Sequence, residues 1–133
     1  MLSEGAITKG VALAKAMNAR VTGLTASSTF HTFAMDPLMV TDTPAQYAKD
    51  CEARAQKYLS SIEKAAKTAG APYEGVHAVH DHPYEAIIDT AAEKGCDLIF
   101  MASHGRKGMS AVLLGSETVK VLTHSKIPVL VCR

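Results

Sequence analysis

The residues best suited to chemistry are a group of small and polar residues near the C-terminal end of the chain. Gly105 follows Ser103 and His104, and Gly115 and Ser116 stand beyond an interval of nine residues. Glycines let the backbone approach an anion closely, and the free amides at the start of a helix favour phosphate. These residues predict a phosphate site. The alternative is an ordinary glycine turn in which Ser116 only caps a helix.

Two apolar runs flank this loop and indicate that it connects two parallel strands. Residues 97–102 form a short apolar run of the kind that is buried on both faces of a parallel sheet, and residues 127–131 form a second one. We expect a helix that begins at Gly115 and Ser116 to fill the space between them, with Pro128 preventing its continuation. Ligands of open α/β sheets lie outside the carboxyl ends of the strands, so the loop after residue 102 is in the expected place for a binding site.

The rest of the chain predicts alternating helices and strands. Apolar spacing, caps and prolines favour helices over residues 3–17, 44–68 and 82–95. Strands are predicted over residues 20–26 and 73–79. Residues 27–43 are irregular, and we expect their apolar side chains to pack on the domain rather than form a flap. The alternation predicts an α/β fold, an open parallel sheet with helices on both faces.

Other sites of chemistry are weakly indicated. His77, His80 and His82 alternate beside Asp81 near a strand end, so two of them could approach one metal ion; the alternative, which we favour, is that they point to solvent separately. The chain has no nucleophile elbow, no carboxylate pair spaced for acid–base catalysis and no Walker phosphate loop. A reactive role for Cys132 is less expected than a buried one. The sequence therefore predicts neither a catalytic nor a metal site.

Composition excludes several classes of partner. The 133 residues fit one domain, and 47% apolar content is enough for a core. A net charge of +1 gives no reason to expect nucleic acid or an anionic membrane as a partner. No run approaches the ~18 apolar residues of a membrane span, and the first residues lack a secretory pattern. Three cysteines without metal-ligand spacing fit a reducing compartment, so we expect a cytoplasmic protein.

The glycine loop resembles the C-terminal signature of the universal stress protein family. Nucleotide-binding members of that family carry Gly, two residues, Gly, nine residues, Gly, and then Ser or Thr. Gly105, the nine residues 106–114, Gly115 and Ser116 fall on this frame, and Ala102 stands in place of the first glycine. The resemblance implies a Rossmann-like fold of the adenine nucleotide alpha hydrolase-like type, with residues 1–133 as one domain.

The resemblance also implies a ligand, ATP or AMP with Mg²⁺ or Mn²⁺ held mainly by the nucleotide. The base would lie near Ala26 and Met101, and the ribose and phosphates would meet the glycine frame. The implied nucleotide-binding residues are Ala26, Met101, Ala102, Ser103, His104, Gly105, Gly115, Ser116, Glu117 and Thr118.

The same resemblance reveals a gap at the start of the chain. Family members begin with a strand that ends in an Asp, and Met1 stands where that Asp would be. This strand is central in the family's five-stranded sheet, whose order is 3-2-1-4-5. Three explanations are open: natural residues ahead of Met1, which we favour, a segment of another chain in the gap, or direct pairing of the two flanking strands.

Family members commonly form dimers through antiparallel pairing of the last strand. We therefore expect a homodimer whose interface includes Ile127, Val129, Leu130, Val131 and Cys132. The predicted function is a stress-response regulator that binds an adenine nucleotide. Two alternatives remain: a dimeric scaffold that binds no nucleotide and acts through unknown protein partners, and a slow ATPase.

Overall fold

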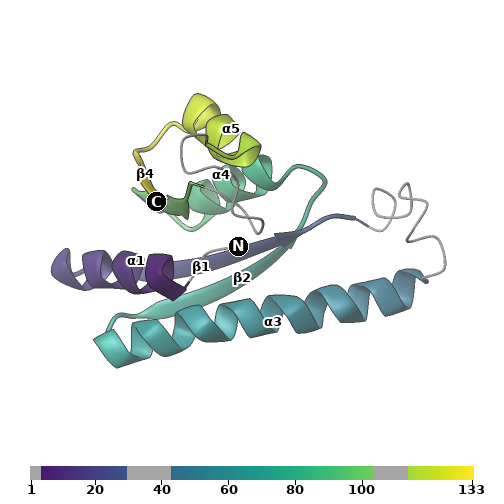
Figure 1. The fold of residues 1–133 in the computed structure, drawn as a ribbon, viewed down its shortest axis with the longest axis horizontal. Coiled ribbons are helices and arrows are strands. Elements are labelled where there is room, and N and C mark those ends of the chain that lie inside the picture. The colour runs from purple at the N-terminus through teal and green to yellow at the C-terminus, as the bar shows by residue number, and fades with distance from the viewer. Residues whose placement is uncertain (1–3, 30–42, 104–113) are drawn as a thin grey trace.

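The computed structural model describes residues 4–29, 43–103 and 114–133. Helices and strands alternate along these residues (Figure 1). In chain order the elements are α1 (Glu4–Ala16), β1 (Val21–Ser27), α3 (Pro44–Ala69), β2 (Tyr73–Val79), α4 (Pro83–Glu93), β3 (Ile99–Ala102), α5 (Ser116–His124) and β4 (Val129–Cys132). The predicted α/β architecture is confirmed.

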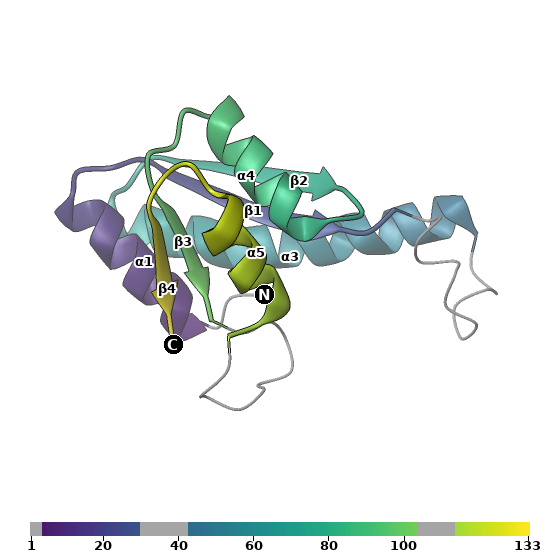
Figure 2. The same ribbon diagram turned by 90° about the horizontal axis from the view of Figure 1, so that it is seen from above.

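The described strands form two separate parallel pairs. β1 pairs with β2 over its whole length, from Val21 opposite Tyr73 to Ser27 opposite Val79. β3 pairs with β4, from Ile99 opposite Val129 to Ala102 opposite Cys132. β1 and β3 do not pair with each other, and Figure 2 shows the two pairs running in different directions. Direct closure of the gap by the flanking strands, one of the three explanations considered above, is therefore wrong for the described residues.

Helices cover both faces of the strands. α3 packs on β1 and β2 with α1 beside it, whereas α4 and α5 pack together on the opposite side (Figure 1). A core cluster of Ala91, Ile99 and Val121 joins α4, β3 and α5. The side chains packed around that cluster are Tyr84, Ile87, Cys96, Met101, Ile127 and Val129. Helix α4 also contacts β1, and α1 contacts β3, so the helices of each side reach both strand pairs.

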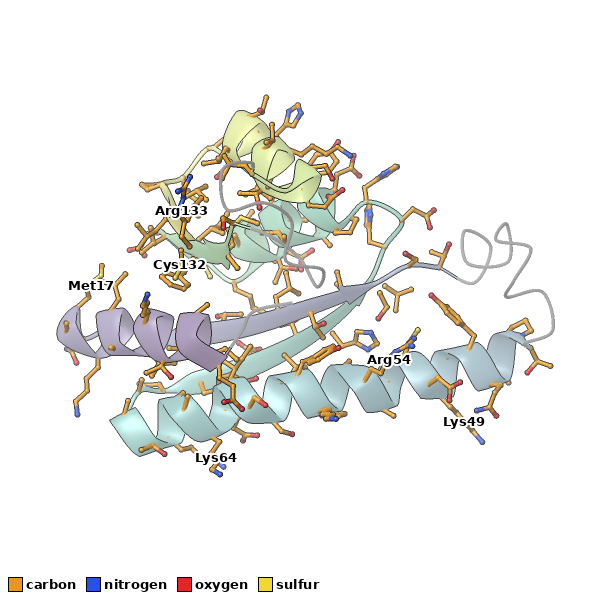
Figure 3. The ribbon with its side chains drawn as sticks, in the orientation of Figure 1. Met17, Lys49, Arg54, Lys64, Cys132 and Arg133 are labelled. Atoms are coloured by element: carbon orange, nitrogen blue, oxygen red, sulfur yellow. The ribbon has the colours of Figure 1, made fainter. Side chains whose placement is uncertain are left out.

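Helix α3 shows why the sequence pattern predicted its position. Thr43 caps its start by accepting a 3.1 Å hydrogen bond from the amide of Gln46, and Pro44 occupies its first turn. Gly70 ends it with a left-handed φ of 75°. One face is buried at intervals of four residues, through Tyr47, Cys51, Ala55 and Leu59. On the opposite side Lys49 and Lys64 point away from the strands, whereas Arg54 lies toward them (Figure 3).

Strand boundaries differ modestly from expectation. β3 begins at Ile99 rather than Asp97, because the ladder with β4 begins where the Ile99 amide donates to the carbonyl of Pro128 over 3.0 Å. β4 correspondingly begins at Val129 and extends to Cys132. Most of the irregular segment 27–43 and the predicted cap at Ser3 lie outside the described residues.

The packing of helix α1 against β3 requires a small residue at position 10. A Cβ added at Gly10 would lie 2.9 Å from Cδ1 and 3.0 Å from Cε1 of the Phe100 ring. We expect Gly10→Ala to lower the free energy of unfolding by about 1 kcal/mol, although Ala normally stabilises a helix relative to Gly. Urea denaturation measures this change. A Phe100→Leu background should remove the penalty, and a Gly10→Ala variant more stable than the parent would contradict the close packing.

Candidate functional site

The start of α5 is held against the carboxyl end of β3 by backbone hydrogen bonds. The Ser103 amide donates to the carbonyl of Cys132 over 2.8 Å, which extends the β3–β4 ladder. The Ser103 carbonyl accepts a 2.7 Å hydrogen bond from the Gly115 amide. Ser103 is buried. The two ends of the glycine frame that the structure describes therefore lie in direct contact, while His104 and Gly105 lie outside the described residues.

No side chain of the described residues caps the first amides of α5. Gly115 is the N-cap residue, with an extended backbone (φ −63°, ψ 152°), and has no side chain to accept from them. The first intrahelical hydrogen bond runs from the Val119 amide to the Gly115 carbonyl over 3.1 Å. The amides of Ser116, Glu117 and Thr118 precede it and have no intrahelical partner. Such amides, together with the helix dipole, favour an anion.

The Thr118 hydroxyl is hydrogen-bonded to the end of β3 and is therefore not directed to a ligand. Thr118 is 3% exposed, and its hydroxyl lies 3.2 Å from the Ala102 carbonyl oxygen and 3.3 Å from that of Ser103. One hydroxyl hydrogen shared between these oxygens ties α5 to the end of β3. In this arrangement Thr118 offers a ligand its backbone amide and not its hydroxyl.

The Glu117 carboxylate is also engaged within the protein. One oxygen accepts a 3.0 Å hydrogen bond from the Tyr84 amide at the start of α4, and the other lies 3.4 Å from the Lys120 ammonium. The nearby Glu85 hydrogen bond raises the pKa of the Tyr84 hydroxyl. The negative charge of Glu117 is therefore turned toward α4, and the amide of Glu117 can still face an anion.

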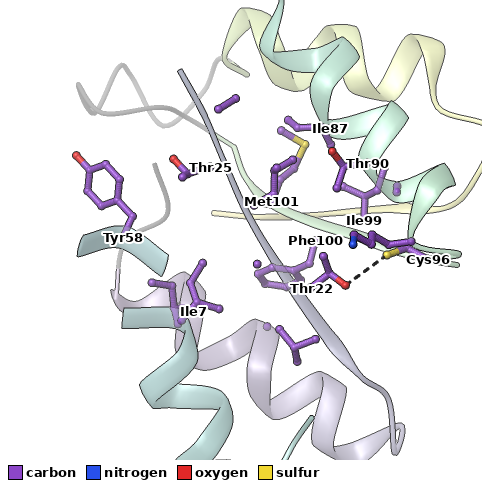
Figure 4. Close-up of a pocket in the computed structure, with 18 of the residues that line it drawn as sticks. Ile7, Thr22, Thr25, Tyr58, Ile87, Thr90, Cys96, Ile99, Phe100 and Met101 are labelled. Atoms are coloured by element: carbon purple, nitrogen blue, oxygen red, sulfur yellow. Dashed lines mark hydrogen bonds between the residues drawn. The ribbon is translucent and has the colours of Figure 1, made fainter. Parts of the chain in front are cut away.

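A cavity of about 1020 Å³ opens beside this site. Its lining includes Ala26 at the end of β1, Met101 and Ala102 on β3, and Glu117 and Thr118 on α5. Met101 and Ile87 lie under α4 on one side, and Ile7 and Tyr58 lie on the other (Figure 4). The structure thus brings five of the predicted residues to one cavity, and Gly115 is linked to Ala102 through its hydrogen bond to Ser103. Ser116, also predicted, does not line this cavity.

Three polar side chains, Ser27, His77 and Glu52, form a hydrogen-bonded relay beside the end of β1. This relay was not predicted from the sequence. The Ser27 hydroxyl lies 2.9 Å from Nε2 of His77, and Nδ1 of His77 lies 2.9 Å from the Glu52 carboxylate. Hydrogen bonds from Gln56 and then His77 lower the pKa of Glu52. When neutral His77 donates from Nδ1 to this carboxylate, Nε2 is left to accept from Ser27, so the relay holds that hydroxyl in place. No local motif reveals it, because its residues come from β1, α3 and β2.

A second contact anchors the same end of β1. The Tyr47 hydroxyl donates a 2.7 Å hydrogen bond to the Ser28 carbonyl. Burial and the neighbouring Cys51 raise the pKa of Tyr47 to about 12, so the hydroxyl keeps the proton it donates. Helix α3 therefore positions the strand end that carries Ala26.

The histidines considered for metal binding are engaged with protein groups in the structure. His77 belongs to the relay, and Nδ1 of His80 accepts from the amide of His82 over 2.9 Å. Nε2 of His80 lies 3.5 Å from Glu85. Across residues 4–29, 43–103 and 114–133, no group of three or more His, Cys, Asp or Glu side chains could hold a metal ion. Within the same ranges, no helix is both long and apolar enough to cross a membrane.

The model of the Universal stress protein family matches residues 2–133. In sequence, the chain is similar to Universal stress protein MJ0577 of Methanocaldococcus jannaschii, with 34% identity over 79 residues, which are 59% of this chain and 48% of that protein. The chain spans about half, or less, of the length of the curated relatives that it matches first.

Solved structures are similar over most of the chain. The MJ0577 structure has a TM-score of 0.74 at 24% identity and covers 92% of this chain and 84% of that one. A universal stress protein in complex with cAMP has a TM-score of 0.68 at 26% identity, with 98% and 86% covered. A universal stress protein from Archaeoglobus fulgidus in complex with dAMP has a TM-score of 0.64 at 18% identity, with 98% and 86% covered. The similarities to the MJ0577 structure and to the dAMP complex show the fold of this chain.

The link between α5 and β3 can be tested at Thr118. We expect Thr118→Val to lower the free energy of unfolding by about 1 kcal/mol, because the carbonyls of Ala102 and Ser103 lose their shared donor while the side-chain shape is kept. Urea denaturation measures the change, and Thr118→Ser, which retains a hydroxyl, should lose less. A Thr118→Val variant as stable as the parent would show that these contacts do not hold α5 in place.

Proposed function

The chain belongs to the universal stress protein family, and from this premise we propose that it is a cytoplasmic stress-response regulator that binds ATP or AMP and acts as a homodimer. One observation carries the nucleotide proposal. The uncapped amides at the start of α5 lie beside the carboxyl end of β3 and next to a cavity that reaches Ala26 and Met101. A phosphate chain fits the amides, and an apolar base fits the cavity.

The proposed pose uses the residues of the glycine frame. The phosphates would accept hydrogen bonds from the amides of residues 116–118, and the base would lie between Ala26 and Met101. His104 and Gly105 are part of the proposal as residues of the frame, although they lie outside the described residues. Mg²⁺ or Mn²⁺ would be held mainly by the phosphates, because the carboxylate in the first turn of α5, Glu117, is bonded to Tyr84 and Lys120.

Two observations bear on the nucleotide assignment, and a third bears on the location. Relatives have been solved in complex with cAMP and with dAMP, which are adenine nucleotides. The Ala102 carbonyl is turned to Thr118, so the residue that replaces the first glycine of the frame already has a defined role in the fold. Free thiols at Cys51, Cys96 and Cys132 support the cytoplasmic location.

The dimer proposal rests on the outer edge of β4. The amide of Ile99 donates to Pro128 and that of Ser103 donates to Cys132, so even-numbered β4 residues bond to β3. The backbone groups of Val129 and Val131 then face outward, and no further described strand pairs with them. Leu130 is 43% exposed. An edge of this kind suits antiparallel pairing with a second copy.

Calorimetric titration with Mg-ATP tests the nucleotide proposal. We expect binding by the parent chain and at least about tenfold weaker binding by Gly115→Val, because a branched side chain would cover the α5 amides. The extended backbone at Gly115 accepts any residue, so the variant should fold. Ser116→Ala, which keeps every amide, is the matched control.

Other outcomes of that titration separate the alternatives. Absence of binding by a folded parent chain would favour the scaffold that acts through protein partners. Release of ADP from bound ATP at a rate that Gly115→Val abolishes would identify the slow ATPase.

The dimer is tested by light scattering at micromolar concentration. We expect the parent to have twice the monomer mass and Val131→Pro to be monomeric, because proline removes an outward amide and leaves the β3–β4 ladder intact. Val131→Ala keeps that amide and should remain a dimer. A monomeric parent chain would refute the proposal.

A further inference from the structure

The relay at the end of β1 has the three parts of an activated serine. The Ser27 hydroxyl lies 2.9 Å from Nε2 of His77, and Nδ1 of the same ring lies 2.9 Å from the Glu52 carboxylate. A serine is activated when a base lies within hydrogen-bond reach and a third group orients that base. Such an arrangement is identified by its geometry and by the role of each group, and not by sequence position.

Strand register brings the serine and the histidine together on the side of the strands that α3 covers. Thr25 lies opposite His77, and Ser27 is two positions further along β1, so Ser27 and His77 are diagonal neighbours on one face. A Cβ added at Gly23 would lie 3.3 Å from Cδ1 of Ile62 on α3, and alternation directs the Ser27 side chain to the same face. The relay therefore lies between the β1–β2 pair and α3, and not between β1 and β3.

The Glu52 carboxylate is held in the orientation that a base requires. One oxygen accepts a 2.8 Å hydrogen bond from the side-chain amide of Gln56, one turn later on α3, and the other lies 2.9 Å from Nδ1 of His77. These two hydrogen bonds lower the pKa of Glu52, so its carboxylate is ionised at neutral pH and can only accept. The proton of a neutral His77 ring is then on Nδ1, and the lone pair of Nε2 faces Ser27.

The Ser27 hydroxyl is open to a ligand while its base is shielded. Ser27 is half-buried and lines the cavity, whereas the His77 side chain is 12% exposed and does not line it. Tyr47 fixes the chain directly after the serine through its hydrogen bond to the Ser28 carbonyl. Arg54 lines the same cavity and lies toward the strands (Figure 3), so α3 brings a positive charge to this side of β1.

We propose that Ser27 is a nucleophile for acyl transfer from small carboxylic esters, with His77 as its general base and Glu52 as the residue that positions the base. Arg54 stabilises the negative charge that develops on the ester carbonyl oxygen. An ester is the substrate class because its alkoxide leaves more readily than an amine, and the relay supplies a single acid–base group. This activity is independent of nucleotide binding and uses no residue of the glycine frame.

The reaction needs only the ester and water. Oγ of Ser27 forms a bond to the ester carbonyl carbon while its proton moves to Nε2 of His77. The ester C–O bond then breaks, and the leaving alcohol takes that proton. Water next gives a proton to Nε2 and attacks the acyl carbon, which releases the carboxylic acid and returns the proton to Ser27. The imidazolium formed in each half is stabilised by the Glu52 carboxylate.

Covalent labelling of the whole chain tests whether Ser27 is a nucleophile. The probe is an alkyl fluorophosphonate, from which a reactive hydroxyl displaces fluoride and forms a stable bond to phosphorus. Ser60, exposed on α3 with its hydroxyl bonded to the Gln56 carbonyl, is the internal reference. We expect Ser27 to be labelled at least about 100-fold faster than Ser60, as mapped by mass spectrometry. Equal labelling of the two serines would overturn the proposal.

Hydrolysis of p-nitrophenyl acetate by matched variants tests the role of each residue. We expect Ser27→Ala to lose the activity and Ser28→Ala, which removes the adjacent hydroxyl, to keep it. His77→Gln should reduce the rate at least about 100-fold, because the serine loses its base. Glu52→Gln should reduce it at least about tenfold, because an amide that donates to Nδ1 leaves the proton on Nε2. Activity that persists in Ser27→Ala would refute the proposal.

The pH dependence separates a general base from a residue that only supports the fold. We expect the rate of the parent chain to fall in acid, because a protonated His77 cannot accept the serine proton. The residual rate of His77→Gln should lack this fall. Arg54→Met should be slower than the parent at every pH, because the charge of Arg54 does not change. The same acid fall in the parent and in His77→Gln would mean that His77 is not the base, contrary to the proposal.

Discussion

A parallel strand presents hydrogen-bonding groups to both sides, and this requirement governs the whole molecule. β1 satisfies one side through β2, and β3 satisfies one side through β4. β1 and β3 both line one cavity. Buried amides and carbonyls without partners are costly, and in the described part of the chain no ladder joins β1 to β3.

The two strand pairs are held together by side chains and by helix α1. Lys94 at the end of α4 forms a 2.6 Å ion pair with Glu74 on β2, and its hydrogen bond lowers the pKa of that carboxyl. The Arg20 guanidinium donates to the Lys94 carbonyl over 3.4 Å. Exposed pairs of this kind contribute little free energy. The close contact of α1 with the Phe100 ring is accordingly important, because it joins the layer that covers β1 to the strand β3.

Much of the fold could be predicted because the signals are local. The strand Tyr73–Val79 and the start of α3 follow from alternation, a Thr cap and a proline, which act over a few residues. For the candidate site, the glycine frame named Ser103 and Gly115, and the structure brings these two residues into contact. The inward hydroxyl of Thr118 and the engaged carboxylate of Glu117 were not predictable, because their partners lie on other elements. The relay of Ser27, His77 and Glu52 depends on strand register and helix placement, which no short motif encodes.

The separation of the two strand pairs also determines how the molecule loses its structure. No ladder crosses from β1 to β3 within the described residues, so the backbone does not oblige β3, β4, α4 and α5 to melt together with β1, β2 and α3. In the described part of the chain, cooperativity between the halves depends on side-chain contacts and on helix packing, through α4 on β1 and α1 on β3. A strand hydrogen-bonded to both pairs would add a backbone link between the two halves.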